Sequence, residues 1–183
     1  MSSRKDVDDK TDRVIQMAVA RAIELDIGKI IVASCSGRTA MKLIGCGLAV
    51  VCVTHQVGFY KPGADEMGAD MRRTLQEKGV ELLTTTHFMA GIDRALRMQC
   101  GGIYPSEIVA TTLRMFGEGT KVCIEISIMA TDAGLAEPGR ELVALGGTGK
   151  GADTALVIQP AHSQSFFETT IREFICKPAE PHT

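Results

Sequence analysis

The segment Lys29-Ile-Ile-Val-Ala-Ser-Cys-Ser-Gly-Arg-Thr-Ala40 is followed closely by Leu48-Ala-Val-Val-Cys-Val-Thr54. Each segment contains a short run rich in β-branched residues, which is typical of a buried strand. The first run, 29–33, leads through a small polar turn into a short helical patch at 40–44. Strand, turn, helix and strand in this order favour a parallel sheet covered by helices.

The same rhythm continues along the chain. A first amphipathic helix is expected at 11–26, with Thr11 or Asp12 as N-cap and a stop at Gly28. After the two strands, the pattern predicts helices at 65–78, 90–98 and 106–116, a third strand at 81–85 and a fourth strand at 121–129.

The C-terminal part departs from this alternation. Two strand-like runs, 141–145 and 154–159, are separated by a glycine-rich loop with no helix between them, which predicts an antiparallel addition. The final segment, 166–176, is either a helix or an extended arm. We therefore expect a three-layer α/β/α fold with a mostly parallel, doubly wound sheet, formed as one domain over residues 1–183 with its core at about 11–176.

Composition excludes several classes of function. The net charge of −2 and pI near 6.1 provide no field that would attract nucleic acid or an anionic membrane. The longest apolar runs are too short and too interrupted by glycine to span a bilayer, and residues 1–12 lack the apolar segment of a secretory signal. We expect a cytoplasmic protein.

Cysteine and histidine spacing predicts no metal site. No two of the six cysteines form a C-x-x-C pair, and several lie in apolar runs, so we expect buried free thiols. The four histidines, His55, His87, His162 and His182, are far apart and lack the i, i+4 spacing of a helical metal site.

Polar turns follow the predicted strands at 34–39, 54–58, 84–87 and 129–134, and the ends of parallel strands meet at one edge where ligands bind. The first turn offers backbone N–H groups, hydroxyls and a guanidinium to a phosphate. The alternative is that Ser36 or Thr39 only caps the helix while Arg38 is solvated.

These residues resemble the α/β domain at the C-terminus of pyruvate kinase, in which a hydroxyl-rich Ser-Gly turn holds a phosphate of the sugar bisphosphate activator. The resemblance assigns that role to Ser34, Ser36, Gly37, Arg38 and Thr39. From about residue 11 to 176 the chain is similar to free-standing relatives of this domain, mainly archaeal and bacterial. The matching segments are Val53-Thr-His-Gln-Val-Gly-Phe59, Gly102-Ile-Tyr-Pro105, Leu113-Arg-Met-Phe116, Val122-Cys-Ile-Glu-Ile-Ser127 and Gly146-Gly-Thr-Gly-Lys-Gly-Ala-Asp-Thr154.

The resemblance implies flavin mononucleotide (FMN) as the first candidate ligand. It also implies that these residues have no pyruvate kinase activity, because that reaction takes place on a separate barrel domain. The relatives often carry Gly-Glu-Thr where this chain has Gly37, Arg38 and Thr39, and an arginine favours an anion more than a glutamate does.

The glycine loop at 146–151 matches neither the G-x-x-x-x-G-K-[ST] nor the G-x-G-x-x-G motif. Its backbone amides and Lys150 either approach a ligand or form a flexible hairpin tip. Its candidate ligand-contacting residues are Gly147, Thr148, Gly149, Lys150 and Asp153.

Glu125 is a charged residue in the middle of the predicted strand 121–129, where a central parallel strand should be apolar on both faces. It either pairs with a buried arginine such as Arg97 or Arg114, or reaches a pocket and acts as an acid or base. Further acid/base candidates are His87 and Asp132.

Other ligand contacts are expected from Thr54, His55, Thr86 and His87 at the strand ends. Each histidine is alternatively a plain hydrogen-bonding loop residue. Tyr104, Phe59 and Phe88 are the aromatic residues available to stack on a flavin, or else they belong to the core.

Three functions remain open from sequence alone. The leading one is binding of a phosphorylated small molecule, with FMN first. The second is an enzyme, either flavin-dependent or using acid/base groups on an unknown substrate. The third is an interaction module with a vestigial activator site, for which the expected partner is another copy of the same chain in a homo-oligomer.

Overall fold

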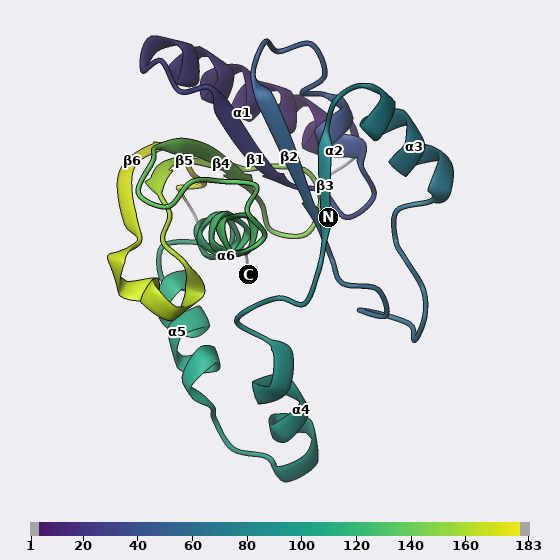
Figure 1. Cartoon of the computed structure of the whole chain (residues 1–183), viewed down its shortest axis with the longest axis vertical. Coiled ribbons are helices and arrows are strands. Elements are labelled where there is room, and N and C mark those ends of the chain that lie inside the picture. The colour runs from purple at the N-terminus through teal and green to yellow at the C-terminus, as the bar shows by residue number, and fades with distance from the viewer. Residues whose placement is uncertain (1–3, 180–183) are drawn as a thin grey trace.

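The computed structural model describes residues 4–179, and residues 1–3 and 180–183, including His182, lie outside that part. Within the described part, six strands form one sheet in the order β3-β2-β1-β4-β5-β6 (Figure 1). The strands are β1 (Lys29–Ala33), β2 (Ala49–Thr54), β3 (Glu81–Thr84), β4 (Leu142–Gly146), β5 (Thr154–Gln159) and β6 (Thr170–Cys176). Strands β1 to β4 are parallel to one another, whereas β5 is antiparallel to β4 and β6 is antiparallel to β5. The predicted α/β class and its antiparallel addition are confirmed.

Helices cover both faces of this sheet. On one face lie α1 (Arg4–Glu24), α2 (Arg38–Met41) and α3 (Ala69–Glu77), and on the other lies α6 (Glu118–Asp132) (Figure 1). The helices α4 (Gly91–Cys100) and α5 (Pro105–Arg114) extend away from the sheet beyond α6, and a 3₁₀ helix, η1 (Ser163–Glu168), precedes β6. This is the expected three-layer arrangement.

Alternation along the strands divides the core into two clusters. Ile30 and Val32 of β1 pack with the α1 side, whereas Ile31 packs with Ile128 and the rest of α6. Because both faces of β1 are covered, the run 30–32 is apolar throughout and fully buried, as expected for a central parallel strand.

The expected fourth strand at 121–129 is wrong, since these residues form the middle of α6. Apolar Val122, Ile124, Ile126 and Ile128 alternate with other residues, and this mimics the period of a strand. The helix is buried along most of its length, so it needs apolar residues on nearly every side and shows no amphipathic stripe.

Helix α1 begins well before the expected N-cap. Thr11 lies inside the helix and is buried, and its hydroxyl accepts a hydrogen bond from the Ala152 N–H at 3.1 Å. The segment 166–176 combines the end of η1 with β6, so it is an extended arm in its second half.

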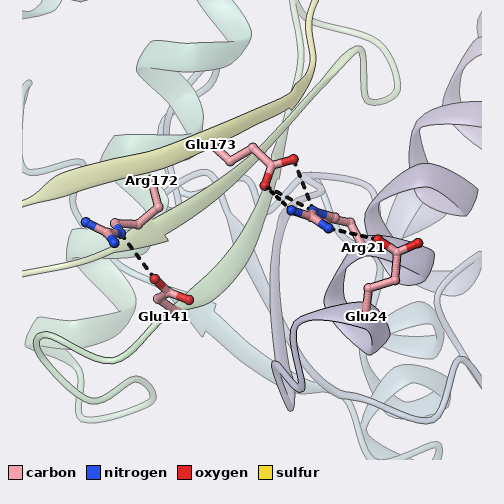
Figure 2. A network of polar contacts seen from close by, with 5 residues as sticks. All are labelled: Arg21, Glu24, Glu141, Arg172 and Glu173. Carbon is pink, nitrogen blue, oxygen red and sulfur yellow. Dashed lines mark hydrogen bonds and ion pairs between the residues drawn. The ribbon is translucent and has the colours of Figure 1, made fainter.

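Strand β6 is fixed to the body by charged pairs as well as by its ladder (Figure 2). The single Nε–H of Arg21 is shared between the two carboxylate oxygens of Glu173 at 3.0 and 3.1 Å, and Nη2 donates a second hydrogen bond at 2.9 Å. Its neighbour Arg172 donates to Glu141 at 3.2 Å. Since adjacent residues of a strand point to opposite faces, these pairs hold β6 to α1 on one side and to the segment before β4 on the other.

The cysteines are free thiols in different environments. Cys52 and Cys123 are buried, Cys35, Cys46 and Cys176 are half-buried, and Cys100 is exposed. The expectation of buried thiols is therefore wrong for Cys100, which lies on α4, a helix with no buried residue. None of the helices described at 4–179 has both the length and the apolar character needed to cross a bilayer.

Candidate functional site

The carboxyl ends of β1 to β4 lie at one edge of the sheet. The turn 34–39 follows β1, His55 follows β2, His87 lies shortly after β3, and the glycine loop follows β4. Strand β1 lies between β2 and β4, so the chain leaves it toward β2 and returns on its other side at β4. This is a topological switch point, the place where open α/β sheets bind ligands.

The fourth expected turn, 129–134, lies at the opposite edge. It follows the C-terminal end of α6, and the Leu135 carbonyl accepts a hydrogen bond from Lys29, the first residue of β1. Asp132 therefore lies away from the carboxyl edge, where it accepts hydrogen bonds from the Ser163 N–H and faces His162 Nδ1, both at 3.1 Å. Partial burial raises the pKa of Asp132, but the contacts with Ser163 and His162 outweigh it and the net shift is downward.

A cavity of about 580 Å³ lies between the carboxyl ends of β1 and β2 and the helices α4, α5 and α6. This volume lies within the range typical of small-molecule sites. The cavity's polar lining combines both signs of charge and two histidines: Thr54, His55, His87, Arg94, Arg97, Glu107, Arg114, Glu118, Lys121 and Glu125.

Glu125 lines this cavity but does not pair with either arginine that the sequence suggested. It forms an ion pair with Lys121, one turn earlier on α6, and it accepts the Met89 N–H at 3.3 Å. Arg97 and Arg114 instead pair with Glu107 and Glu118. The side chains of Lys121 and Glu125 are only 11% and 6% exposed, so the cavity wall contains an enclosed ion pair.

Three rings gather at the other wall of the cavity. His55 stacks on Phe59 with centroids 3.9 Å apart, and His87 lies 5.2 Å from His55 and 5.3 Å from Phe59. Arg94 lies over the Phe59 ring at 5.3 Å. Burial lowers the pKa of His87, with the charges of His55, Lys121 and Arg94 acting in the same direction and Glu125 opposing it. The neutral imidazole is thus favoured.

In the turn after β1, some side chains already form hydrogen bonds within the fold and others are exposed. The Ser34 hydroxyl accepts the N–H groups of Thr39 and Ala40 at 3.1 and 3.4 Å, so it caps α2. Ser36 and Arg38 are exposed, with Arg38 Nε donating to Ser36 Oγ at 3.3 Å. Gly37 has φ of 81°, and a Cβ there would lie 2.4 Å from Met71 Cγ, so no other residue fits without rearrangement.

The glycine loop folds on itself beside this turn. Asp153 is buried and accepts hydrogen bonds from the Thr148 N–H and hydroxyl at 3.2 and 2.8 Å. Gly147 passes so close to the Gly151 carbonyl that a Cβ would lie 2.4 Å from its oxygen. Thr148, Gly149 and Lys150 are exposed at the tip.

The expected contact residues therefore divide into two neighbouring groups. Thr54, His55, His87 and Glu125 line the cavity, joined there by Cys35 and Phe59. Ser36, Arg38 and the glycine loop lie outside the cavity lining, at the ends of β1 and β4.

Three further candidates are not in the cavity lining. Thr86 is exposed, Tyr104 is half-buried at the start of α5, and Phe88 packs against Phe166 at 5.9 Å. Sequence reasoning also missed Lys121 and Arg94. The i, i+4 spacing of Lys121 and Glu125 was the available signal, hidden by the strand assignment of the segment.

Sheet order and switch point define a doubly wound α/β protein with its candidate site at the carboxyl edge of the sheet. The family described as Pyruvate kinase, alpha/beta domain matches residues 12–158, which is most of the chain. The chain belongs to this family.

Proposed function

We propose that this protein binds a phosphate-bearing small molecule at the carboxyl edge of its sheet, with FMN as the first candidate. The observation that carries the proposal is the position of the turn 34–39. It follows β1 directly and lies beside the glycine loop at the switch point, with Ser36 and Arg38 exposed to a ligand.

The charges around this turn favour an anion there. Lys42, just after α2, pairs with Asp8 and Asp12 of α1 at 3.6 and 2.7 Å, which partly offsets the charge of these two carboxylates. The exposed guanidinium of Arg38 and the ammonium of Lys150 are then available on either side of the switch point. A guanidinium binds phosphate oxygens through two parallel hydrogen bonds.

The adjoining cavity supports a ligand with an extended ring system. Phe59, His55 and His87 present a cluster of rings, and Arg94 lies beside them without a carboxylate partner among residues 4–179. Ring faces of this kind stack on planar heterocycles. These rings therefore support FMN, the ligand that the resemblance implies, over a sugar phosphate.

The test is calorimetric titration of FMN and of riboflavin into the wild-type protein, Arg38→Ala and Arg140→Ala. Arg140 is a matched control because it is also exposed but lies near the opposite end of β4, paired with Glu137 at 3.2 Å. Loss of a charge-assisted hydrogen bond should weaken FMN binding by about 1.5–3 kcal/mol in Arg38→Ala. Equal FMN affinity in all three proteins would contradict the assignment of the turn.

A second candidate function is acid/base catalysis in the cavity, favoured by the enclosed Lys121–Glu125 pair beside the neutral His87. In this function His87 acts as the base and removes a proton from the carbon next to a carbonyl group, and Lys121 stabilises the resulting negative charge. The test is deuterium incorporation from heavy water into phosphorylated aldehydes and ketones. Acid/base catalysis is supported if the wild-type protein and Glu118→Gln incorporate deuterium and His87→Gln does not. No incorporation by the wild-type protein would count against it.

A further inference from the structure

Three chemically different metal-binding groups meet where β1 and β2 end. They are the thiol of Cys35, the imidazole of His55 and the carboxylate of Glu66. One ligand atom from each, the thiol Sγ, a ring nitrogen and a carboxylate oxygen, lies within 4.8 Å of the other two. Cys35 comes from the connection between β1 and α2, whereas His55 and Glu66 come from the connection between β2 and α3, so their spacing in the sequence gives no motif.

The fold explains why these groups converge. Parallel pairing places Ala33 opposite Val53, so Cys35 and His55 leave the sheet side by side. The loop after His55 closes through the Gly58 N–H and the Ala64 carbonyl at 2.8 Å, which returns the chain to this edge. Glu66 Oε1 then lies 2.6 Å from His55 Nδ1.

Neighbouring contacts hold two of the groups in place. The His55 ring is stacked on Phe59 with an interplanar angle of 22°. Met67, directly after Glu66, is buried, and its N–H donates to Asp65 at 2.9 Å. Ligands held by surrounding contacts lose less conformational freedom when a metal binds.

We propose that Cys35, His55 and Glu66 bind a zinc ion. Thiolate, imidazole and carboxylate are the three ligand types zinc takes, whereas magnesium and calcium prefer oxygen ligands alone. Three protein ligands leave one tetrahedral position open, as in zinc sites that bind water or substrate. Since Cys35 and His55 also line the cavity, a fourth ligand reaches the ion from there.

The simpler reading is a hydrogen bond between His55 and Glu66 beside an uninvolved thiol. Glu66 is 31% and His55 26% exposed, so burial does not force the two groups to pair. The two interpretations differ in the role of Cys35, which is a metal ligand in the zinc site and has no role in the hydrogen-bonded pair.

The test uses the full chain stripped of metal, titrated with zinc against a chromophoric chelator and with cobalt under the spectrometer. A thiolate-to-cobalt charge-transfer band and one zinc per chain are expected for the wild-type protein. Cys35→Ser should abolish the band, and Cys35→Ser, His55→Ala and Glu66→Gln should each weaken zinc binding at least about tenfold.

Two variants serve as matched controls and should bind zinc as the wild-type protein does. Cys46→Ser removes another half-buried thiol, and Glu118→Gln removes a carboxylate that lines the nearby cavity but is not among the three ligands. Circular dichroism and melting of each variant separate loss of a ligand from loss of the fold.

An absent band in the wild-type protein, or a band that survives Cys35→Ser, would overturn the proposal. Unchanged zinc affinity in Glu66→Gln would overturn the three-ligand site in the same way. Because only zinc and cobalt ions are used as probes, these outcomes are independent of whether the protein binds a phosphate.

Discussion

Lys121 and Glu125 form an enclosed ion pair one turn apart on α6, at the wall of the cavity. Lys121→Met removes the cation and leaves an uncompensated buried carboxylate, so we expect a loss of about 3–5 kcal/mol in the free energy of unfolding. The double variant Lys121→Met/Glu125→Met should recover most of this loss, because it removes both charges. Urea denaturation of the single and double variants measures the difference. A double variant no more stable than the single one would contradict the pairing.

At Gly119, α6 packs closely against Thr154 of β5. A Cβ at this position would lie 2.2 Å from Thr154 Oγ1, whose hydroxyl donates to Asp153 at 2.7 Å. Gly119→Ala should therefore cost about 1–3 kcal/mol of stability through overpacking. Gly28→Ala is the control, since nothing lies within 4 Å of a Cβ there. Equal unfolding free energies for the two variants would show that α6 packs less closely than described.

The pKa of His87 is lowered, mainly by burial. Its ring signals in NMR should titrate with a midpoint below 6.5 in metal-free protein. An unfolded chain binds the proton more readily than the folded protein does. Above the unfolded pKa of His87 the residue is neutral in both states and costs no stability. As the pH falls from the unfolded pKa through the lower folded pKa, the free energy of unfolding should decrease. His87→Gln should remove this part of the acid dependence. A midpoint at or above 6.5 would contradict the burial described for this residue.

The pairing of Arg21 with Glu173 attaches β6 to α1, and its side chains are about one-third exposed. Arg21→Ala should destabilise the protein by about 1 kcal/mol or less, because solvent screens a pair of this exposure. Amide hydrogen exchange should accelerate in β6 but not in β1. Uniform acceleration across the sheet would mean that β6 is not a separate unit of stability.

The sequence predicted the first two strands of the parallel part of the sheet closely. Strands β1 and β2 agree with the expected boundaries to within one residue, because β-branched runs between turns indicate buried strands without further context. The antiparallel β5 was also predicted with its boundaries, from the glycine loop that separates two strand-like runs.

Helix α6 and the cavity were not predictable in the same way. A helix buried on most sides has no amphipathic period, and the alternating isoleucines between Ile124 and Ile128 imitated a strand. Because of that error, Glu125 was predicted to lie on a strand of the sheet, and Asp132 was predicted to lie at the carboxyl edge instead of the opposite edge. The cavity depends on α4 and α5 lying over α6, a tertiary arrangement that local patterns do not encode.

Thermal melting of the purified protein with FMN and with riboflavin, together with its visible spectrum, tests the central claim most directly. A ligand that binds only the folded state must raise the melting temperature. We predict a rise with FMN, little or none with riboflavin, and loss of the FMN effect in Arg38→Ala but not in Arg140→Ala. No rise with FMN, or an equal rise with both flavins, would contradict a phosphate anchor at the turn after β1.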